Sequence, residues 1–373
     1  MTSALPVVVI GGGVAGCAAA VAAAEHGATT IVIEAAHMLG GVAVQGEHRT
    51  LCGLAPIDAA TADLLEPQLV ARWIDKLSTG PAFRQGRVWL WPTNALTLQR
   101  GLLKEIHQSG VDLRRGRRIQ GCARTAEERW LVQLDDGQKI TARELIDASG
   151  AGVVAGLLGL SRQSAQQWSA HRSLLQVPSL TRGTGARIAA IRTAHLASGL
   201  SSAIALVPLD VASDQWQLSL DVMPGSGLTR VAEIVERIAQ ALNGTVLTMN
   251  VTLAQRDDGR PASSLDLTEL FATQERGVCW AAWPQENHGV DGVEWQWPAT
   301  DRHGIPERAV HVAGAPDNLW CIGKGAAVTA FAAAALRVTG TCLAMGAAVG
   351  IRAATRTLPE KAKRTKGHQR AEA

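Results

Sequence analysis

A glycine-rich turn between an apolar strand and an alanine-rich helix lies near the start of the chain, and it restricts the possible folds more than any other feature. Val7–Ile10 has the length and composition of a buried strand, and the residues from Val14 to Ala24 predict a helix. Gly11, Gly13 and Gly16 follow the strand at G-x-G-x-x-G spacing. In this pattern the first glycine permits a tight turn, the second lets backbone approach a pyrophosphate, and the third lets helix and strand pack closely. The pattern predicts a unit that binds a dinucleotide.

The residues after this helix complete the unit. Gly27 ends the helix, Thr29 to Ile33 predicts a second strand, and Glu34 lies at the end of that strand. A carboxylate there can accept hydrogen bonds from both ribose hydroxyls of a nucleotide, while the helix N-terminus offers free N–H groups to its phosphates. An ordinary strand-turn-helix without a ligand is the alternative. The candidate contacts to the nucleotide are Gly11, Gly13, Val14, Ala15, Gly16, Glu34 and Ala35.

Size and charge favour a globular enzyme over a nucleic-acid-binding protein. The chain has 373 residues, of which 47% are hydrophobic and 18% charged, so one large or two intertwined domains are expected. The net charge is +3, and the segment from Glu360 to Ala373 alone carries five Lys or Arg against two Glu. The rest of the chain is therefore close to neutral and gives no case for a nucleic-acid surface.

Targeting and metal signals are absent from the sequence pattern. The first predicted strand starts within six residues of Met1, which leaves no room for a signal peptide, and no glycine-free apolar stretch reaches the roughly 18 residues of a membrane span. The six cysteines are scattered without a C-x-x-C pair. We therefore expect a cytoplasmic protein with no integral membrane segment, mostly buried thiols and no metal site.

The sequence after the first unit predicts a strand meander, then a region of different sequence pattern, and finally a segment that returns to the first unit. Short strands are predicted between residues 111 and 150, with the hairpin signal Asp135-Asp136-Gly137 among them. The last of these strands ends in Asp147-Ala148-Ser149-Gly150, which predicts a second tight turn at the carboxyl edge of the sheet. Residues 318–323 predict a further strand that runs into a third glycine turn. The helices and strands expected in other parts are 59–77, 87–91, 94–108, 216–223, 228–242, 245–253, 326–336 and 341–354.

These segments together resemble FAD-dependent oxidoreductases of the glutathione-reductase-like, two-dinucleotide-fold flavoprotein superfamily. The resemblance depends on the opening unit, Leu39-Gly40-Gly41, Ile146 to Gly150 and a C-terminal segment. Closest is a subgroup in which a Trp-Pro-Ile-Glu-like segment and an Ile-Pro segment precede that C-terminal segment. In this chain the corresponding residues are Trp283 to Glu286, His303 to Pro306, Gly323-Lys324, Arg337-Val338, Cys342, Met345-Gly346 and Ala348 to Gly350.

The resemblance implies an α/β fold, with a Rossmann-like FAD-binding domain (parallel central sheet and β-meander) and an inserted α+β substrate domain. The expected boundaries are 1–154 for the first part of the FAD-binding domain, 155–310 for the substrate domain, 311–357 for the return segment and 358–373 for a disordered basic tail. It also implies further FAD contacts at Gly40, Gly41, Ser149, Gly150, Gly323, Lys324, Arg337 and Thr341. Lys324 and His303 depart from the residue types common in the subgroup.

Catalytic residues are harder to identify. His48 and Arg49 follow the Gly-Gly turn closely enough to reach a flavin, and a solvated loop position is the alternative for both. Just before the return strand lie Glu286, His288, Asp301 and His303. A His or carboxylate there could remove a substrate proton, although a structural role is the more common one for each. Cys52 is expected to be an inert core thiol. Lys324 could bind an anionic substrate or a phosphate.

The expected activity is hydride transfer between FAD and a small organic substrate, with NAD(P)H or oxygen as candidates for a second redox partner. An NAD(P)-dependent dehydrogenase and a non-catalytic flavin-binding or maturation protein are the alternatives. The flavin prediction fails if the segment from Cys321 to Thr341 packs away from the N-terminal strands.

Overall fold

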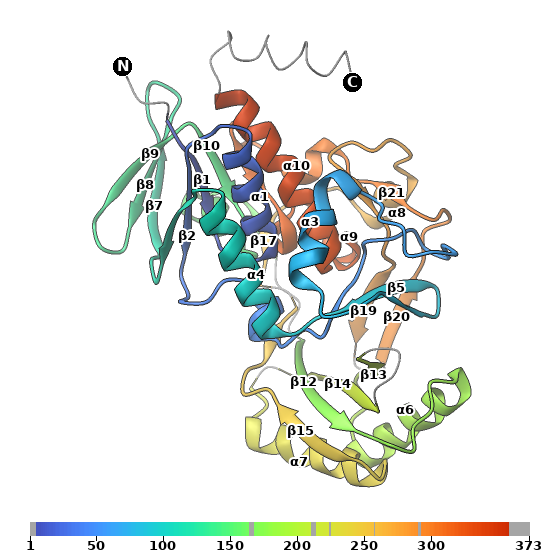
Figure 1. Ribbon diagram of the computed structural model, residues 1–373. Helices are drawn as coiled ribbons and strands as arrows, with labels where there is room; N and C mark the ends of the chain where they lie inside the picture. Colours follow the sequence, from blue (N-terminus) through green and yellow to red (C-terminus); the bar gives the residue numbers. More distant parts are fainter. Residues whose placement is uncertain are drawn as a thin grey trace.

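A five-stranded parallel sheet forms the centre of the computed structural model, which describes residues 5–163, 168–209, 214–223, 225–256, 258–289 and 292–357. Its strand order is β22-β10-β1-β2-β6, and every neighbouring pair is parallel (Figure 1). The expected α/β class and parallel sheet are confirmed. The strands are β1 (Val7–Ile10), β2 (Thr30–Glu34), β6 (Asp112–Arg115), β10 (Glu144–Asp147) and β22 (Leu319–Cys321).

Alternate side chains of these strands enter two separate cores. Val7, Val9 and Val32 pack on the helical side, while Val8 and Ile10 pack against the meander. Because both faces are covered, β1 and the centre of β2 are continuously apolar rather than alternating between polar and apolar residues. The meander is the three-stranded antiparallel sheet β7 (Ile119–Arg124), β8 (Trp130–Leu134) and β9 (Lys139–Ala142).

Two helices from opposite ends of the chain lie side by side on the helical face. These are α1 (Val14–Glu25) and α10 (Thr339–Thr357). A Cβ atom added to Gly346 would lie 2.2 Å from the Ala15 carbonyl oxygen, and one added to Gly350 would lie 2.1 Å from that of Ala19. The two backbones therefore approach closely enough to exclude any side chain at these glycines. Helices α3 (Pro67–Leu77) and α4 (Ala95–Gln108) complete this layer.

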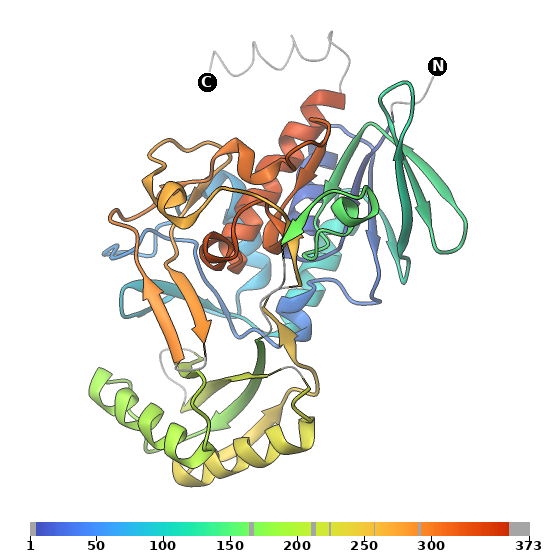
Figure 2. The same cartoon turned by 180° about the vertical axis from the view of Figure 1, so that it is seen from behind.

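A second sheet forms a separate body at the other end of the molecule (Figures 1 and 2). Its order is β13-β14-β12-β15, with β16 beside β12, and all of its pairs are antiparallel. Helices α6 and α7 cover one face around a third apolar cluster that includes Leu175, Trp216 and Val235. The bounds are β12 (Ser169–Gln176), α6 (Thr184–Ser198), β13 (Ile204–Pro208), β14 (Gln215–Val222), α7 (Leu228–Ala241), β15 (Thr245–Met249) and β16 (Ala254–Gln255).

The chain then returns to the main body. Leu265, Cys279 and Ile305 belong to the same core as α1 and α10. This segment contains α8 (Leu267–Ala272), β18 (Trp280–Ala281), the hairpin of β19 (Gln285–Gly289) and β20 (Gly292–Gln296), and β21 (His303–Gly304). The other elements are α2 (Val42–Gln45), β3 (Thr50–Leu51), β4 (Phe83–Gln85), β5 (Val88–Pro92), α5 (Val153–Leu157), β11 (Arg162–Gln163), β17 (Arg260–Pro261) and α9 (Ala330–Leu336), with short 3₁₀ turns at Glu307–Val310 and Gly323–Gly325.

In the described part of the chain, no helix by itself has the length and apolar character needed to cross a membrane. By length and composition alone, the bent pair α9 and α10 passes such a test together, with 92° between the two helices. Both helices are largely buried inside the protein. The predicted basic tail, 358–373, lies outside the described residues.

Candidate active site

Three glycine turns meet at the carboxyl edge of the parallel sheet. Gly11 has a φ of +104°, and a Cβ atom on it would lie 2.5 Å from the Ala148 carbonyl oxygen in the second turn. A Cβ on Gly16 would lie 2.0 Å from the Gly11 carbonyl oxygen. Gly13 differs from both, since its φ is −66° and a Cβ there would meet no atom of the described chain within 4 Å. Gly11 and Gly16 are thus needed for packing, whereas Gly13 borders open space at the N-terminus of α1.

Glu34 fastens the first turn. Its Oε2 atom accepts a hydrogen bond of 2.6 Å from the Gly12 N–H, and its Oε1 atom accepts one of 2.6 Å from the Ala36 N–H. A carboxylate has about four lone-pair positions, so two positions remain for ribose hydroxyls. The predicted position of Glu34 at the end of β2 is confirmed; its nucleotide contact stays a prediction.

The Gly40-Gly41 turn lies directly beside the first turn. The Gly40 N–H donates to the Gly12 carbonyl over 2.8 Å, and a Cβ on Gly41 would lie 3.3 Å from the Gly13 Cα. Both residues have positive φ, +99° for Gly40 and +52° for Gly41. The loop therefore begins at the open space beside Gly13.

The C-terminal segment reaches the same edge. A Cβ on Gly323 would lie 2.9 Å from the Ala15 Cβ, and one on Gly325 would lie 3.6 Å from the Gly150 Cα. The side chain of Lys324 lies against Gly150 and pairs with Asp258. The segment from Cys321 to Thr341 therefore packs against the N-terminal strands and their turns, as the flavin prediction requires.

Ser149 and Thr341 use their hydroxyls differently. The Ser149 hydroxyl donates to Asp147 over 2.6 Å and accepts from the Val153 N–H over 3.1 Å, so it shapes its own turn. The Thr341 hydroxyl lies in the first turn of α10, is buried, and has no hydrogen-bond partner in the described part of the protein. A buried hydroxyl without a protein partner is unusual in a folded protein.

A cavity of about 770 Å³ opens between this region and the second sheet. Strand alternation decides which side chains reach it. On β14, Trp216, Leu218 and Leu220 enter the apolar cluster under the helices, whereas Gln217 and Ser219 line the cavity. Further lining residues are His48, Arg49, Cys52, Arg172, Arg256, Trp283, Glu286, His288, Lys324 and Arg337.

A chain of charged side chains crosses the wall of this cavity. Asp221, only 1% exposed, accepts hydrogen bonds from His288 Nδ1 through one oxygen and from Arg256 Nε, over 2.9 Å, through the other. Burial alone would raise the pKa of Asp221, but these two partners outweigh it and lower the pKa below its usual value. On the other side of the ring, His288 Nε2 lies 3.5 Å from the Glu286 carboxylate. This carboxylate also accepts a hydrogen bond of 2.9 Å from Trp283 Nε1.

The pKa of Glu286 is also lowered. Burial acts in the opposite direction, but His288, Arg337 and Arg256 favour the ionised carboxylate. The cavity wall therefore holds an imidazole whose orientation is set by a buried carboxylate, with a second carboxylate next to its other nitrogen.

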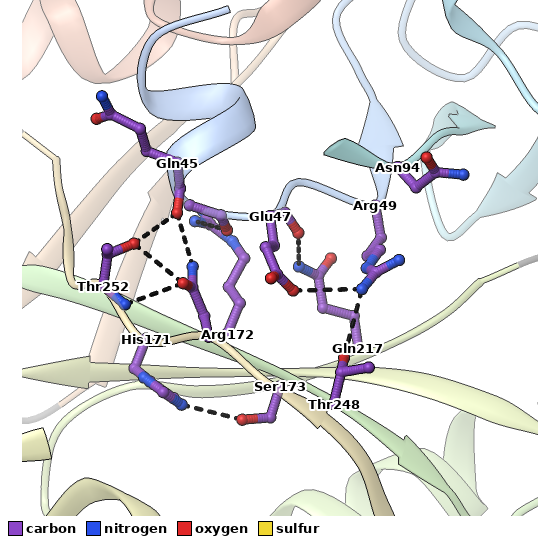
Figure 3. A network of polar contacts seen from close by, with 12 residues as sticks. Gln45, Glu47, Arg49, Asn94, His171, Arg172, Ser173, Gln217, Thr248 and Thr252 are labelled. Atoms are coloured by element: carbon purple, nitrogen blue, oxygen red, sulfur yellow. Dashed lines mark hydrogen bonds and ion pairs between the residues drawn. The ribbon is translucent and has the colours of Figure 1, made fainter. Parts of the chain in front are cut away.

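The loop from Gln45 to Arg49 is held against the second sheet (Figure 3). The Gln45 carbonyl accepts hydrogen bonds from Asn250 and Thr252 over 2.8 and 2.6 Å, and the Gly46 carbonyl accepts from Arg172 over 3.1 Å. Arg49 pairs with Glu47 over 3.3 Å and donates to Thr248. These contacts fix the position of the loop that carries His48.

The predicted catalytic candidates separate into two groups. His48, Arg49 and Glu286 all line the cavity. Burial, with Arg172 and Arg256 nearby, lowers the pKa of His48 well below its usual value, so His48 is neutral at pH 7. Cys52 also lines the cavity and is half-buried; burial and Glu286 raise the pKa of its thiol, as an unreactive cysteine requires.

His303 lies elsewhere. It is fully buried, pairs with Ala281 between β21 and β18, and packs on the Phe271 ring at a centroid distance of 5.0 Å. It is not among the lining residues of the cavity. Burial lowers its pKa to about 4, and its Nε2 atom has no hydrogen-bond partner within the described ranges.

We expect His303 to destabilise the protein in mild acid. The pKa of His303 is about 4 in the folded chain and 6.5 for an ordinary histidine, so between these pH values the unfolded chain binds a proton that the folded chain does not. The stability of the folded chain is therefore unaffected by this histidine above pH 6.5 and decreases as the pH falls toward 4. The loss amounts to roughly 3 kcal/mol. Urea unfolding at pH 7 and pH 4.5 checks this: His303→Leu is expected to lose less stability between the two pH values than the parent chain. An exposed control, His107→Leu, should behave like the parent, and an unchanged pH slope for His303→Leu would contradict the prediction.

Sequence reasoning missed Arg172, Asp221 and Arg256. Ala170 pairs with Asp221 and Arg172 with Ser219 in the register of β12 and β14, so Arg172 and Asp221 are diagonal neighbours. No local motif marks them. Arg172 and Asp221 are brought together by strand pairing across about 50 residues of sequence, and Arg256 reaches Asp221 from the end of β16. His288 was one of the four candidates before the return strand, and it lines the cavity.

Comparison with known proteins gives a family match and a fold match. The sequence model of the family described as FAD dependent oxidoreductase matches residues 6–196 and 263–362. Among solved structures, OxyS anhydrotetracycline hydroxylase from Streptomyces rimosus aligns with 97% of this chain at 14% identity and a TM-score of 0.55. The chain spans 64% of the length of that hydroxylase. A flavoprotein/dehydrogenase from Cytophaga hutchinsonii aligns with 95% of this chain and 79% of its own, at 13% identity and a TM-score of 0.48. No curated protein matches. At 14% identity, the likeness to the hydroxylase shows the fold alone.

Proposed function

Because the chain belongs to the FAD dependent oxidoreductase family, we propose that it transfers hydride between FAD and a small organic molecule held in the cavity below the second sheet. The observation that carries the proposal is the meeting of the three glycine turns at one end of this cavity. Lys324, next to Gly150 in the turns, is also one of the cavity's lining residues. A ligand along the turns would thus reach the cavity.

The residues at the turns fit FAD. Gly13 borders open space at the N-terminus of α1, where free N–H groups suit a pyrophosphate. Glu34 retains acceptor positions for a ribose, and the buried Thr341 hydroxyl awaits a polar partner near the N-terminus of α10. That helix end also favours negative charge. We propose these residues, together with Gly40, Gly41, Gly150, Gly323 and Lys324, as the FAD-binding set.

When bound, FAD supplies a two-electron acceptor for the hydride of a substrate C–H bond. A group of the protein must then accept the proton of the heteroatom attached to that carbon. We assign this proton transfer to His288 and Glu286 acting together at the cavity wall, because His288 Nδ1 is held by Asp221 and its enclosed Nε2 lies beside the Glu286 carboxylate. Asp221 is a positioning residue, since it acts by orienting the ring.

Anaerobic reduction of the FAD-loaded protein with a panel of organic donors tests the proposal, with bleaching of flavin absorption as the readout. With a donor that bleaches the flavin, His288→Gln is expected to lower the reduction rate by about 10²- to 10⁴-fold without loss of FAD. Asp221→Asn should shift the pH profile of the same rate. The exposed His107→Gln serves as the control. A chain that binds NADH but takes up no FAD, or bound FAD that no donor bleaches, would overturn the proposal and favour one of the two alternatives.

Reoxidation identifies the second redox partner. NAD(P)⁺ and oxygen are the two candidates, and mixing each with the reduced protein shows which restores the flavin absorption. Rapid recovery with oxygen alone would indicate an oxidase or oxygenase, and recovery with NAD(P)⁺ alone would indicate an electron-transferring reductase.

A further inference from the structure

The cavity is strongly biased toward positive charge. Seven of its lining residues are Arg or Lys, and one, Glu286, is a carboxylate. Four of the seven have carboxylate partners that do not themselves line the cavity: Arg49 with Glu47, Arg87 with Asp58, Arg256 with Asp221 and Lys324 with Asp258. The three other basic residues of the lining are Arg172, Arg187 and Arg337.

Arg172 is a cavity-lining cation without an ion-pair partner of its own. In the part of the chain that the structure describes, it forms no ion pair, and its guanidinium donates a hydrogen bond to the neutral Gly46 carbonyl. Burial and the charge of Arg256 lower the pKa of Arg172 to about 9, although Asp221 and Glu286 act in the opposite direction. The guanidinium therefore stays protonated at neutral pH in a site that does not fully stabilise it. An anion in the cavity would supply the missing negative charge. A carboxylate suits this position, because the five N–H donors of a guanidinium form a fork that matches its two oxygens.

Arg172 is also held rigidly and in the right place. Its strand β12 is paired on both sides, by β14 and β15, and the Gly46 carbonyl restrains one end of its guanidinium (Figure 3). Asp221, which orients His288, is its diagonal neighbour on the same face of the sheet. A group bound by Arg172 would therefore lie near the proposed proton-transfer residue.

The lining also contains an apolar part that is rich in tryptophan. Trp283, Trp295 and Trp297 contribute to it, and the last two stack with ring centroids 6.2 Å apart. Leu90 and Val207 add aliphatic surface. Volumes of this size hold an organic molecule of roughly drug size.

We infer that the substrate is an aromatic or otherwise apolar carboxylic acid whose carboxylate binds Arg172 and whose apolar part lies against the tryptophans. The inference rests on the proposed function, because it identifies the substrate class of the same cavity. It assigns to Arg172 a binding role that sets the orientation of the substrate relative to His288.

Matched pairs of acids and amides test the inference. We would titrate the FAD-loaded protein with phenylacetate and indole-3-acetate, and with phenylacetamide and indole-3-acetamide, following flavin difference spectra and tryptophan fluorescence. The acids are expected to bind about ten- to a hundredfold more tightly than the amides. Arg172→Gln should remove this preference, Arg172→Lys should restore part of it, and Arg84→Gln, outside the cavity lining, should leave it unchanged. The FAD content of all four proteins should be equal.

Equal binding of acids and amides by the parent chain, absence of binding by either acid at millimolar concentration, or a preserved preference in Arg172→Gln would overturn the inference. Tryptophan fluorescence reports on the cavity whether or not FAD is bound, so this failure is separable from failure of the proposed function. A chain that prefers acids but holds no FAD would refute the redox proposal alone.

Discussion

Replacing Gly13 with leucine is expected to abolish retention of FAD while leaving the fold intact. Gly13 has an ordinary φ of −66°, and no described atom lies within 4 Å of where its Cβ would be, so a larger side chain costs the apoprotein little. The same side chain would fill the space beside Gly41 in which we place the pyrophosphate. The expected loss of FAD affinity is at least about a hundredfold, or ~3 kcal/mol.

The measurement is flavin absorbance of the purified protein together with its thermal midpoint in the FAD-free state. Gly227→Leu provides a matched control, since Gly227 also precedes a helix, has a φ of −67° and has no neighbour within 4 Å in the described structure. The control should remain yellow. If Gly13→Leu retained FAD with the parent's affinity, the pyrophosphate would have to lie elsewhere.

Substitution of Gly346 with alanine is expected to destabilise the protein by about 3 kcal/mol or to prevent folding. The added Cβ would lie 2.2 Å from the Ala15 carbonyl oxygen, and because that atom is backbone, relief requires α10 to move away from α1. Forcing even one methyl group into a packed core typically costs about 1–3 kcal/mol, and a backbone neighbour places this site at the upper end of that range. Urea unfolding curves give the free-energy change.

Gly185→Ala is the control for the second prediction. Gly185 lies in helix α6 and has no neighbour within 4 Å among the described residues. Alanine there should leave stability unchanged or raise it by up to ~1 kcal/mol through helix propensity. If Gly346→Ala were as stable as the parent, the close approach of the two helices would be wrong.

The sequence predicted the parallel sheet well because local signals mark its parts. Val7–Ile10 is apolar throughout, as a strand covered on both faces requires. Gly27 and Gly110 lie just after the ends of α1 and α4, as the sequence predicted. Helix boundaries were less accurate where long-range contacts decide them. The helical pattern expected from residue 59 begins in fact at Pro67, and the preceding Glu66 is instead bound by Arg276 over 2.8 Å and by the Trp280 N–H over 2.7 Å.

The second sheet and its cavity were predicted less completely. The expected strands 216–223 and 245–253 correspond to β14 and β15, but β12, β13 and α6 carried no clear periodic signal and were missed. Arg172 and Asp221 lie on strands whose pairing partners are set by packing, so their meeting could not be read from either strand alone. His303 shows the converse: a polar residue in a polar segment can still be enclosed in the core.

The position of β22 in the central sheet has a consequence for biosynthesis. Leu319–Cys321 pairs with β10, yet it leaves the ribosome about 170 residues after β10. At translation rates of about 5–20 residues per second, the nascent chain waits roughly 9–35 s with that edge of the sheet unpaired. An unpaired apolar edge is a template for association with other chains, so this interval is when a chaperone is most needed.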